Sequence, residues 1–459
     1  MPAFDTTPLP EMRPWRRAFG QHRKIASIPV RDDELQRSLT RSAELSRLKL
    51  TLLAIAFVSY GFRDAFTGPV RYYLAHAKLA FIWFVPDMMA FAAVAYFVWY
   101  IAIRRNSAWG ILFSVNIFLS LIIGWLFMSA NAAALFSAVK MMSPIFLGFA
   151  FAGRSINELR WARYSFLLMS ALSVLGLLLS PYVDYPWTGM SVETFGQTKA
   201  VGRVWWSGGA VRYGGFAGDS TMAAYMALFP FILVCTHYRK WFTFLATPII
   251  GYALYLSTNK TAMGCGIIFL AYYLIFEVLT DPKNNELYRK KLTQYSFALV
   301  LVPFILMIAL SGIDLQKINP SLFSMQDRIN STWVFPFIYL SNIFPAGLIT
   351  GCGLGCFVYP MDYTSLGYLR VPVDNFYVST YIMLGFPFAI FVIGAFLGVP
   401  NYKTRDKILL MFLMNIYAVT VQCYGPSTIT VFMGYCFSDM FLTSVKNWKR
   451  RYLAPSGPN

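Results

Sequence analysis

A carboxylate, two arginines and a lysine are placed along the second half of the chain where they could handle a phosphate group. Asp374 comes just before a long apolar run, Arg212 and Lys260 stand close to the start of two others, and Arg328 opens a stretch with an amphipathic pattern. Arginine grips phosphate oxygens in a fork, and lysine adds a point charge. A nearby carboxylate can accept a proton from a hydroxyl. These residue types therefore predict a substrate that carries a phosphate or diphosphate and presents a hydroxyl for deprotonation.

Four more polar residues lie beside those positions and are candidates for binding the same substrate: Asp219, Asn259, Asp327 and Asn375. Each has a structural alternative. Asp and Asn are favoured helix N-caps, so Asp219, Asn259 and the pair Asp374–Asn375 could simply begin helices. Lys260 could contact lipid headgroups, and Arg212 could be a surface residue at the start of a helix.

Two charged residues lie inside apolar runs, where charge is costly and usually faces a cavity. Asp87 stands in IWFVPDMMAFAAV and Lys140 in LFSAVKMMSPIFLG. We include both as candidate substrate-binding residues. The alternative is that Lys140 extends toward the membrane surface and Asp87 pairs with a neighbouring cation. No metal-ligand cluster stands out on the same side of the chain, so we expect no metal and no other cofactor.

The elements that must position these residues are membrane helices. Of the 459 residues, 57% are hydrophobic and 13% are charged. A soluble domain normally carries about a quarter charged residues. Apolar runs long enough to cross the roughly 30 Å hydrocarbon core recur along the chain. We predict an all-α polytopic membrane protein with about twelve spans, at 49–66, 82–103, 107–129, 131–152, 164–182, 220–237, 240–257, 261–279, 295–312, 376–398, 407–424 and 427–445.

The distribution of basic residues predicts the orientation. With both ends in the cytoplasm, the inside segments carry about three times as many Lys and Arg residues as the outside loops, as the positive-inside rule requires. Residues 1–48 and 446–459 then form cytoplasmic basic tails, and 32–49 can form a helix that leads into the first span. Loops 183–219 and 313–375 become large external loops, in which we expect short amphipathic helices. The formal charge of +18 then reflects topology and anionic lipid, and no nucleic-acid partner is needed.

Two further features of the external loops leave alternatives open. Cys352 and Cys356 form a CxxxC pair that could be a disulfide or a metal clip, but without a nearby His we expect neither. Trp187, Trp205 and Trp206 could stack on sugar rings or anchor the membrane interface.

The order of these motifs resembles the superfamily of O-antigen polymerases and O-antigen ligases, in its branch of Wzy-type exopolysaccharide polymerases. An Arg-Gly-Gly-Phe-x-Gly stretch enters a span, a Ser-x-Asn-Lys turn follows, and then come a loop with an Arg, the Gly-rich turn GCGLGCF and an Asn that opens the next span. The motifs cover roughly residues 200–400. Elsewhere the resemblance rests on hydropathy alone.

The resemblance implies a metal-independent, inverting membrane glycosyltransferase that uses undecaprenyl-pyrophosphate-linked glycans on the periplasmic side of the bacterial inner membrane. A flippase and a chain-length co-polymerase of the same pathway are then expected partners, besides the bilayer itself. By the resemblance, Arg212 and Arg328 match family arginines, and Lys260 stands where an Arg is more common. Ligase relatives place a His before the Asn, whereas this chain has Asp374 there. That departure favours a polymerase and moves the role of general base to Asp374.

Three other functions compete with the polymerase. The first is ligase-type transfer of a glycan to a lipid acceptor, and the second is a secondary transporter that uses Asp87, Lys140 and the span 376–398, interrupted by Gly385. The third is a membrane-bound acyltransferase, which the small number of His residues disfavours. A transporter requires its charges along a midplane path, whereas a polymerase requires them beneath an external cavity.

Overall fold

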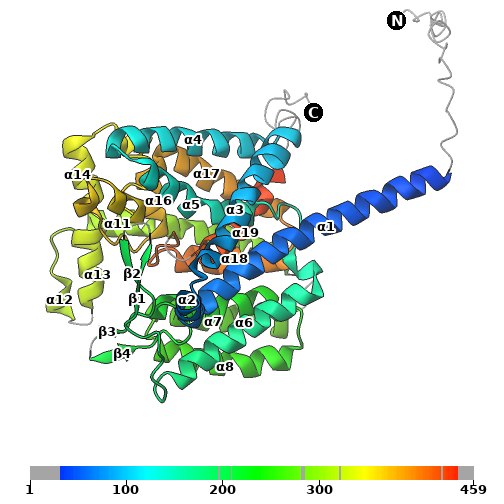
Figure 1. Cartoon of the computed structure of the whole chain (residues 1–459), viewed down its shortest axis with the longest axis horizontal. Coiled ribbons are helices and arrows are strands. Elements are labelled where there is room, and N and C mark those ends of the chain that lie inside the picture. Colours follow the sequence, from blue (N-terminus) through cyan, green and yellow to red (C-terminus); the bar gives the residue numbers. More distant parts are fainter. Residues whose placement is uncertain are drawn as a thin grey trace, which may run out of the picture. The chain divides into compact units, whose positions relative to one another are not determined.

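The computed structural model describes residues 32–194, 197–207, 209–280, 285–319, 322–424 and 427–442. The chain divides into two compact units, residues 1–49 and 50–459, which are described separately. The described part of the first unit is helical from Asp32, as the beginning of α1 (Asp32–Ala65). This agrees with the helix expected over 32–49. The candidate span Glu44–Ala65 begins in the first unit, and the other candidate spans and both large loops belong to the second unit, which is mainly helical (Figure 1).

The α-helices after α1 are α2 (Thr67–His76), α3 (Val85–Tyr96), α4 (Ala108–Met128), α5 (Ala132–Phe149), α6 (Arg160–Leu179), α7 (Ser220–Cys235), α8 (Lys240–Leu256), α9 (Lys260–Tyr273), α10 (Glu286–Ser296), α11 (Val302–Ala309), α12 (Leu315–Ile318), α13 (Phe323–Asp327), α14 (Phe335–Ile343), α15 (Gly347–Thr350), α16 (Phe376–Leu384), α17 (Phe386–Gly398), α18 (Arg405–Tyr417) and α19 (Ser427–Phe437). Three π-helical turns are η2 (Phe97–Arg104), η4 (Leu274–Leu279) and η7 (Arg328–Thr332). The 3₁₀ turns are η1 (Ala80–Phe84), η3 (Ile156–Glu158), η5 (Phe297–Val300), η8 (Tyr359–Tyr363), η9 (Gly367–Leu369), η10 (Val399–Asn401) and η11 (Ser438–Leu442).

The first large loop contains strands, which corrects the expectation of short amphipathic helices there and of a purely helical chain. Strands β1 (Ser191–Thr194) and β2 (Gln197–Ala200) pair antiparallel, and so do β3 (Trp205–Ser207) and β4 (Ala210–Arg212). The segments are short, rich in β-branched and aromatic residues and interrupted by glycine, a composition that favours hairpins over helices. The second loop does carry short helices, from α12 to α15.

Seven helical stretches of the described chain are long and apolar enough to cross a membrane. They are Glu44–Ala65, Ala80–Arg104, Ala108–Met128, Ala132–Phe149, Arg160–Leu179, Lys260–Leu279 and Glu286–Ala309. The other five expected spans coincide with shorter apolar helices: α7, α8, the pair α16 and α17, α18 and α19. The protein is therefore a helical multi-pass membrane protein. At seven of the expected spans, the apolar run forms a helix long enough to cross the membrane.

The expected span 376–398 is broken at Gly385, and the reason is a close contact between main chains. Gly385 has φ 66° and separates α16 from α17. A Cβ atom on Gly385 would lie 2.2 Å from the carbonyl oxygen of Ile349 and 2.4 Å from the nitrogen of Gly351. Only glycine fits both this conformation and this contact. Residues 349–351 of the long loop are thereby packed directly against the break.

A second close approach fixes the middle of the bundle. A Cβ atom on Gly148 of α5 would lie 2.3 Å from the nitrogen of Tyr435, and one on Gly434 of α19 would lie 2.1 Å from the carbonyl oxygen of Ile145. Small residues at a helix crossing let the backbones pack closely, as is common in membrane bundles. Helices α5 and α19 therefore cross at these two glycines.

The long loop, residues 313–375, has a hydrophobic core of its own. Sixteen buried residues form it: Met128, Ala130, Ala134, Met307, Leu315, Ile329, Trp333, Leu340, Cys352, Cys356, Phe357, Met361, Leu369, Val373, Val378 and Ile382. They join α12 to α15 to the ends of the neighbouring membrane helices. In Figure 1 these loop helices lie on the same side of the second unit as the four strands. Both large loops thus gather at one face.

Candidate functional site

Arg328 and Asp374 form an ion pair on the inner side of the long loop. Arg328 begins the π-helical turn η7, and Nη2 of its guanidinium lies 3.5 Å from Oδ2 of Asp374. Ile329 and Trp333 are buried in the loop core, so the turn is anchored while the Arg328 side chain stays 26% exposed. The Asp374 side chain is 51% exposed. Both groups of the pair are therefore partly open to solvent, and π-helical turns often mark functional positions.

Arg212, from the other large loop, acts on the same carboxylate. Burial of Asp374 raises the pKa of its carboxyl group above the ordinary value. The guanidinium groups of Arg328 and then Arg212 lower that pKa, and the carboxylate of Asp327 raises it. Arg212 ends β4, and its Nε is buried with no hydrogen-bond partner among the described residues. The structure thus brings the charges of two arginines and of Asp327 together around Asp374.

A three-residue turn presents Asp374. The nitrogen of Asn375 donates to the carbonyl of Val373 over 2.7 Å, so Asp374 is the central residue of the turn. Asn375 is fully buried, accepts a hydrogen bond from the nitrogen of Val378 and donates one to the carbonyl of Val419. Asn375 is therefore the N-cap of α16, and the side chain of Asp374 is not needed for that role. Asn375 positions the turn, and both polar groups of its side chain are used in hydrogen bonds within the chain.

The first turn of α9 contacts the segment after α18, which also holds Asn375. Thr261 Oγ1 lies 2.5 Å from Oγ1 of Thr420, which follows the Val419 that holds Asn375. On the other side, the nitrogen of Tyr213, next to Arg212, donates to the carbonyl of Leu256 over 3.4 Å. The segments around residues 212, 260, 374 and 419 are thus neighbours, and the long loop adds Arg328.

Lys260 is the first residue of α9 and is exposed. No ion-pair partner for Lys260 occurs in the described part of the chain. Asn259 is 6% exposed and caps α9 by accepting a hydrogen bond from the nitrogen of Ala262. Lys260 is therefore held at the edge of this group of segments by a capped helix, and Asn259 has a structural role.

Two acids beside the arginines differ in what they do. Asp219 caps α7 by accepting a hydrogen bond from the nitrogen of Met222 over 2.8 Å. Asp327 is exposed next to Arg328, at the end of α13. Asp219 is thus engaged in a cap, while the side chain of Asp327 adds negative charge near Asp374.

Asp87 and Lys140 belong to a separate, buried cluster. Asp87 is 1% exposed and pairs with Nη1 of Arg63 at 2.8 Å and with Nζ of Lys140 at 3.0 Å. Tyr60 donates a hydrogen bond to the same carboxylate. Asp64 adjoins the cluster and accepts hydrogen bonds from the hydroxyl of Tyr225 and the nitrogen of Thr428. Asp87 therefore pairs with neighbouring cations, which is the structural alternative considered for it. Of the side chains in the two ion pairs of Asp87, only that of Lys140 is partly exposed, at 21%.

Sequence reasoning overlooked Arg63 and Asp64, which lie at the end of the first predicted span. The signal that could have found them is their occurrence as adjacent opposite charges inside an apolar run. It also overlooked Val419 and Thr420, whose backbone and hydroxyl join two parts of the site. Nothing in the residue types of that pair indicates such a role.

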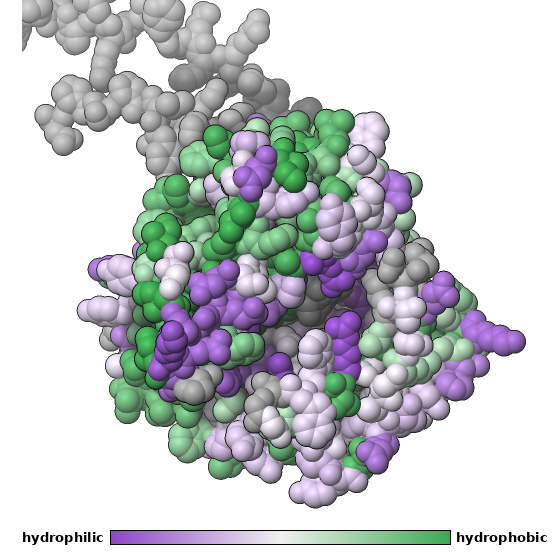
Figure 2. Space-filling model, turned by 90° about the vertical axis from the view of Figure 1, so that its left-hand side faces the viewer, coloured by the Kyte–Doolittle hydropathy of each residue, from purple (hydrophilic) through white to green (hydrophobic). Residues whose placement is uncertain are grey.

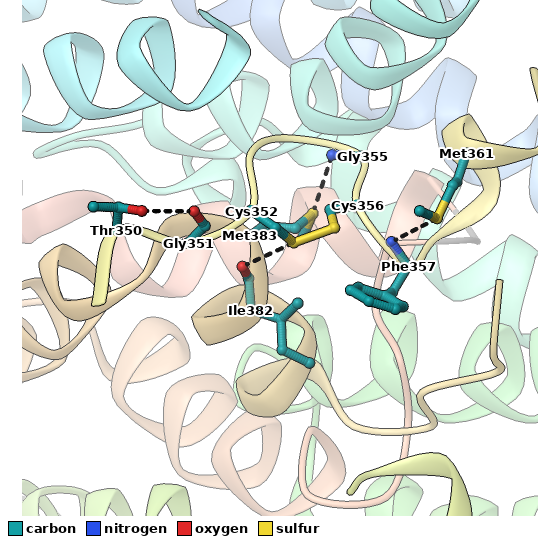
Figure 3. Close-up of a disulfide and its surroundings, with 9 residues drawn as sticks. All are labelled: Thr350, Gly351, Cys352, Gly355, Cys356, Phe357, Met361, Ile382 and Met383. Carbon is teal, nitrogen blue, oxygen red and sulfur yellow. Dashed lines mark hydrogen bonds between the residues drawn. A yellow bond between two sulfur atoms is a disulfide. The ribbon is translucent and has the colours of Figure 1, made fainter. Parts of the chain in front are cut away.

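The Gly-rich turn is closed by a disulfide, which overturns the expectation that Cys352 and Cys356 would be unpaired. Their Cα atoms are 6.0 Å apart, and both residues are buried (Figure 3). The turn is pinned on two sides: the nitrogen of Cys352 donates to the carbonyl of Ile382, and that of Leu354 donates to the carbonyl of Ser120. The CxxxC spacing allowed this pairing, and the fold of the turn brings the two sulfur atoms together.

The face that carries both loops is hollowed. Figure 2 shows hydrophilic residues gathered around a depression on the side where the strands and the loop helices lie. Arg328, Arg212 and Asp374 combine cations with a carboxylate of raised pKa, as binding and catalytic sites often do. This arrangement can hold an anionic group against the guanidinium groups and place a base beside it.

Comparison with known proteins adds no relative. Neither family models nor curated proteins nor solved structures gave a match to this chain.

Proposed function

We propose that this protein polymerises undecaprenyl-pyrophosphate-linked oligosaccharide repeat units into exopolysaccharide at the periplasmic face of the bacterial inner membrane. The observation that carries the proposal is the ion pair of Arg328 with Asp374, together with the positive charge of Arg212, from the other large loop, which lowers the pKa of the same carboxyl group. The multi-pass helical fold suits a substrate whose lipid stays in the bilayer while its headgroup reaches the loops.

The reaction assigns a separate task to each charged group. The hydroxyl of an acceptor sugar attacks the anomeric carbon of the donor glycan, and its proton passes to Asp374. The bond from that carbon to the diphosphate breaks, and the diphosphate leaves with the electron pair. Arg212 and Arg328 stabilise the negative charge that develops on the leaving group, and Lys260 adds to the positive potential. Attack on the face opposite the leaving group inverts the configuration at the anomeric carbon.

The raised pKa of Asp374 supports its role as the base. An exposed Asp has a pKa of about 3.9 and is therefore a weak proton acceptor at neutral pH. Partial burial raises the pKa of Asp374, although the two arginines hold it down. The carboxylate is thus a better proton acceptor than a free Asp.

The disulfide supports the periplasmic assignment of this face. Disulfides form and persist in oxidising compartments, including the bacterial periplasm, and are rare in the cytosol. Cys352 and Cys356 lie in the same long loop as Arg328. The pairing therefore supports the proposal that this loop and the site face the periplasm.

The direct test is turnover by the purified protein of an undecaprenyl-pyrophosphate-linked oligosaccharide repeat unit. Wild type should give a ladder of products that differ by one repeat. Asp374→Asn and Arg328→Gln should each lower the rate by at least about a hundredfold, the usual loss when a general base or a charge-stabilising donor is removed. Products are resolved by gel electrophoresis and mass spectrometry.

The matched control is Arg370→Gln, because Arg370 also pairs with an aspartate of the same loop, Asp362. It should retain the wild-type rate. A ladder of unchanged rate from Asp374→Asn and Arg328→Gln would remove both residues from the chemistry. Transfer of a single glycan to an added lipid acceptor, without a ladder, would select the ligase-type reaction instead.

A secondary transporter is the second candidate, favoured by the buried charges of Arg63, Asp64, Asp87 and Lys140. Such charges inside a membrane protein often mark an ion or substrate path. Proteoliposomes loaded with a pH-sensitive dye decide between the two functions. A proton flux that Asp87→Asn abolishes, with no ladder from the lipid-linked glycan, would favour the transporter.

A further inference from the structure

A pocket of about 240 Å³ lies directly beside Arg212 in the first large loop. Its lining includes Val211 and Tyr213, which flank Arg212, together with Asp184, Tyr185 and Arg203. The volume is below the roughly 300–1,000 Å³ of pockets for drug-sized ligands. The pocket is therefore of a size for one small ring next to the proposed diphosphate site.

The wall of the pocket is rigid and aromatic. The rings of Tyr185 and Trp187 stack with their centroids 4.8 Å apart. Trp187 is 7% exposed and packs against Gly68, where a Cβ atom would lie 2.3 Å from the indole ring. The hydroxyl of Tyr185 donates to the carbonyl of Gly176 over 2.9 Å. These contacts leave Trp187 as support, while Tyr185 and Tyr213 remain half-buried in the lining.

Charged groups line the same pocket from two segments. Asp184 follows the end of α6, and Arg203 precedes β3. Both are exposed, and neither has an ion-pair partner among the described residues. The guanidinium of Arg203 packs over the ring of Trp205 at 5.7 Å. An acceptor and a donor of opposite charge are therefore available within one small recess.

This composition matches the chemistry of a sugar ring. A pyranose presents an apolar face of C–H groups, which an aromatic side chain can cover, and a rim of hydroxyls, which carboxylates and guanidinium groups bind in pairs. The charges of Asp184 and Arg203 cancel, so the pocket favours an uncharged sugar. An anionic headgroup would be attracted instead to the excess positive charge around Arg212.

We infer that this pocket is a subsite for one neutral sugar unit of the glycan, close to the diphosphate-binding arginines. The inference rests on the proposed function and deepens it, because it places a recognition element for the glycan apart from the reacting groups. Asp184 and Arg203 bind the hydroxyls, and the tyrosines cover the apolar face. Selection among repeat units therefore depends on this pocket, and cleavage of the diphosphate bond depends on Arg212, Arg328 and Asp374.

The test begins with binding, which needs no turnover. The purified full chain is screened against a panel of defined neutral oligosaccharides by saturation-transfer NMR. Wild type should bind at least one of them, and Asp184→Asn and Arg203→Gln should each weaken that binding by about tenfold or more, the usual effect of losing hydrogen bonds to a charged group. The matched control is Asp314→Asn, at a helix cap in the other loop, which should bind as wild type does.

The two hypotheses fail in distinguishable ways. With the lipid-linked donor, Asp184→Asn and Arg203→Gln should raise KM about tenfold at unchanged kcat, because uniform binding is lost. A wild-type ladder together with wild-type binding and KM in both variants would overturn the subsite and leave the polymerase. Oligosaccharide binding that depends on both residues, without any ladder, would overturn the polymerase and leave the subsite. Failure of the wild type to bind any member of the panel would also overturn the subsite.

Discussion

At the scale of single residues, the chemistry depends on how three charged neighbours tune Asp374. Burial raises the pKa of its carboxyl group, Arg328 and Arg212 lower it, and Asp327 raises it. Arg328 is also a direct partner, at 3.5 Å. The rise in pKa that burial causes makes Asp374 a better base for sugar hydroxyls, whereas binding of a diphosphate requires the arginines, which lower that pKa. The arginines that increase the affinity of the site for anions therefore decrease the proton affinity of Asp374.

The pH dependence of turnover follows from these neighbours. Asp374 must be deprotonated to act, so kcat/KM should fall on the acid side at a pH above the ordinary Asp value of about 4. Replacing Asp327 with Asn removes a charge that raises the pKa, and the acid limb should move to lower pH. Replacing Arg212 with Gln removes a cation that lowers the pKa, and the limb should move to higher pH. Rate profiles of the two variants and of Arg370→Gln, which should not shift, measure this.

An acid limb that stays at the same pH in both variants would show that Asp374 is not the group that titrates. A shift of both variants in the same direction would contradict the proposed charge arrangement as well.

At the scale of elements, the site is assembled from the ends of helices that are held by close backbone contacts. Helix α16 begins at Phe376, with Asn375 as its N-cap, and ends at the break at Gly385, which packs against Gly351 of the Gly-rich turn. The Gly-rich turn is also fixed to α4, because the nitrogen of Leu354 donates a hydrogen bond to the carbonyl of Ser120. Asp374 is therefore positioned by a helix whose two ends are both constrained.

Substitution of Gly385 tests this arrangement. Gly385→Ala should lower the free energy of unfolding by at least about 1–3 kcal/mol, the usual cost of a strained backbone conformation, with the overlap at Ile349 added to it. Gly264→Ala in α9 is the control, because nothing lies within 4 Å of the added Cβ. That change should be neutral or stabilising by about 0.5–1 kcal/mol. Thermal unfolding in detergent compares the two, and equal transition temperatures would refute the close contact.

The disulfide gives a second prediction for the same turn. Replacing both Cys352 and Cys356 with Ser should destabilise the protein by about 1–2 kcal/mol, toward the low end of the usual range because the closed loop is short. Reductant should lower the unfolding temperature of wild type toward that of the double variant. The variant itself should not respond to reductant, because the other described cysteines are unpaired and buried. A wild-type transition unaffected by reductant would argue against a disulfide in the mature protein.

At the scale of the whole molecule, the second unit combines a helical membrane part with two large loops on one face. The loops are 183–219 and 313–375 in the predicted orientation, and they contribute Arg212 and Arg328. Seven stretches of helix are long and apolar enough to span the bilayer. The remaining apolar helices are shorter and are interrupted or packed inside the bundle, α18 almost completely so.

Single cysteines test the orientation directly. Lys317 and Lys403 are exposed, on the long loop and on the connection after α17. A membrane-impermeant maleimide should label Lys317→Cys in intact spheroplasts and Lys403→Cys only after permeabilisation, because α17 separates two sides of the membrane. The native cysteines among the described residues are buried or paired, so they should give little background. Labelling of both variants from outside would contradict the predicted orientation.

The sequence alone determined that this is a multi-pass helical membrane protein, because hydropathy is a local property of each apolar run. It also indicated Asp374, Arg212, Arg328 and Lys260 as candidates, since polar residues at the ends of apolar runs are conspicuous. Only the tertiary structure decided which of them meet, because the meeting depends on hairpins, on a π-helical turn and on main-chain contacts such as that between Asn375 and Val419.

The same limit explains the corrections. The CxxxC pair could not be assigned from spacing, because its pairing requires the fold of a turn pinned to two helices. The strands of the first loop are short and local, and their residues gave too weak a periodic pattern to predict. Asp87 and Lys140 were found by their burial cost, but their partner Arg63 belongs to another helix, and the contact between helices is not encoded in either segment by itself.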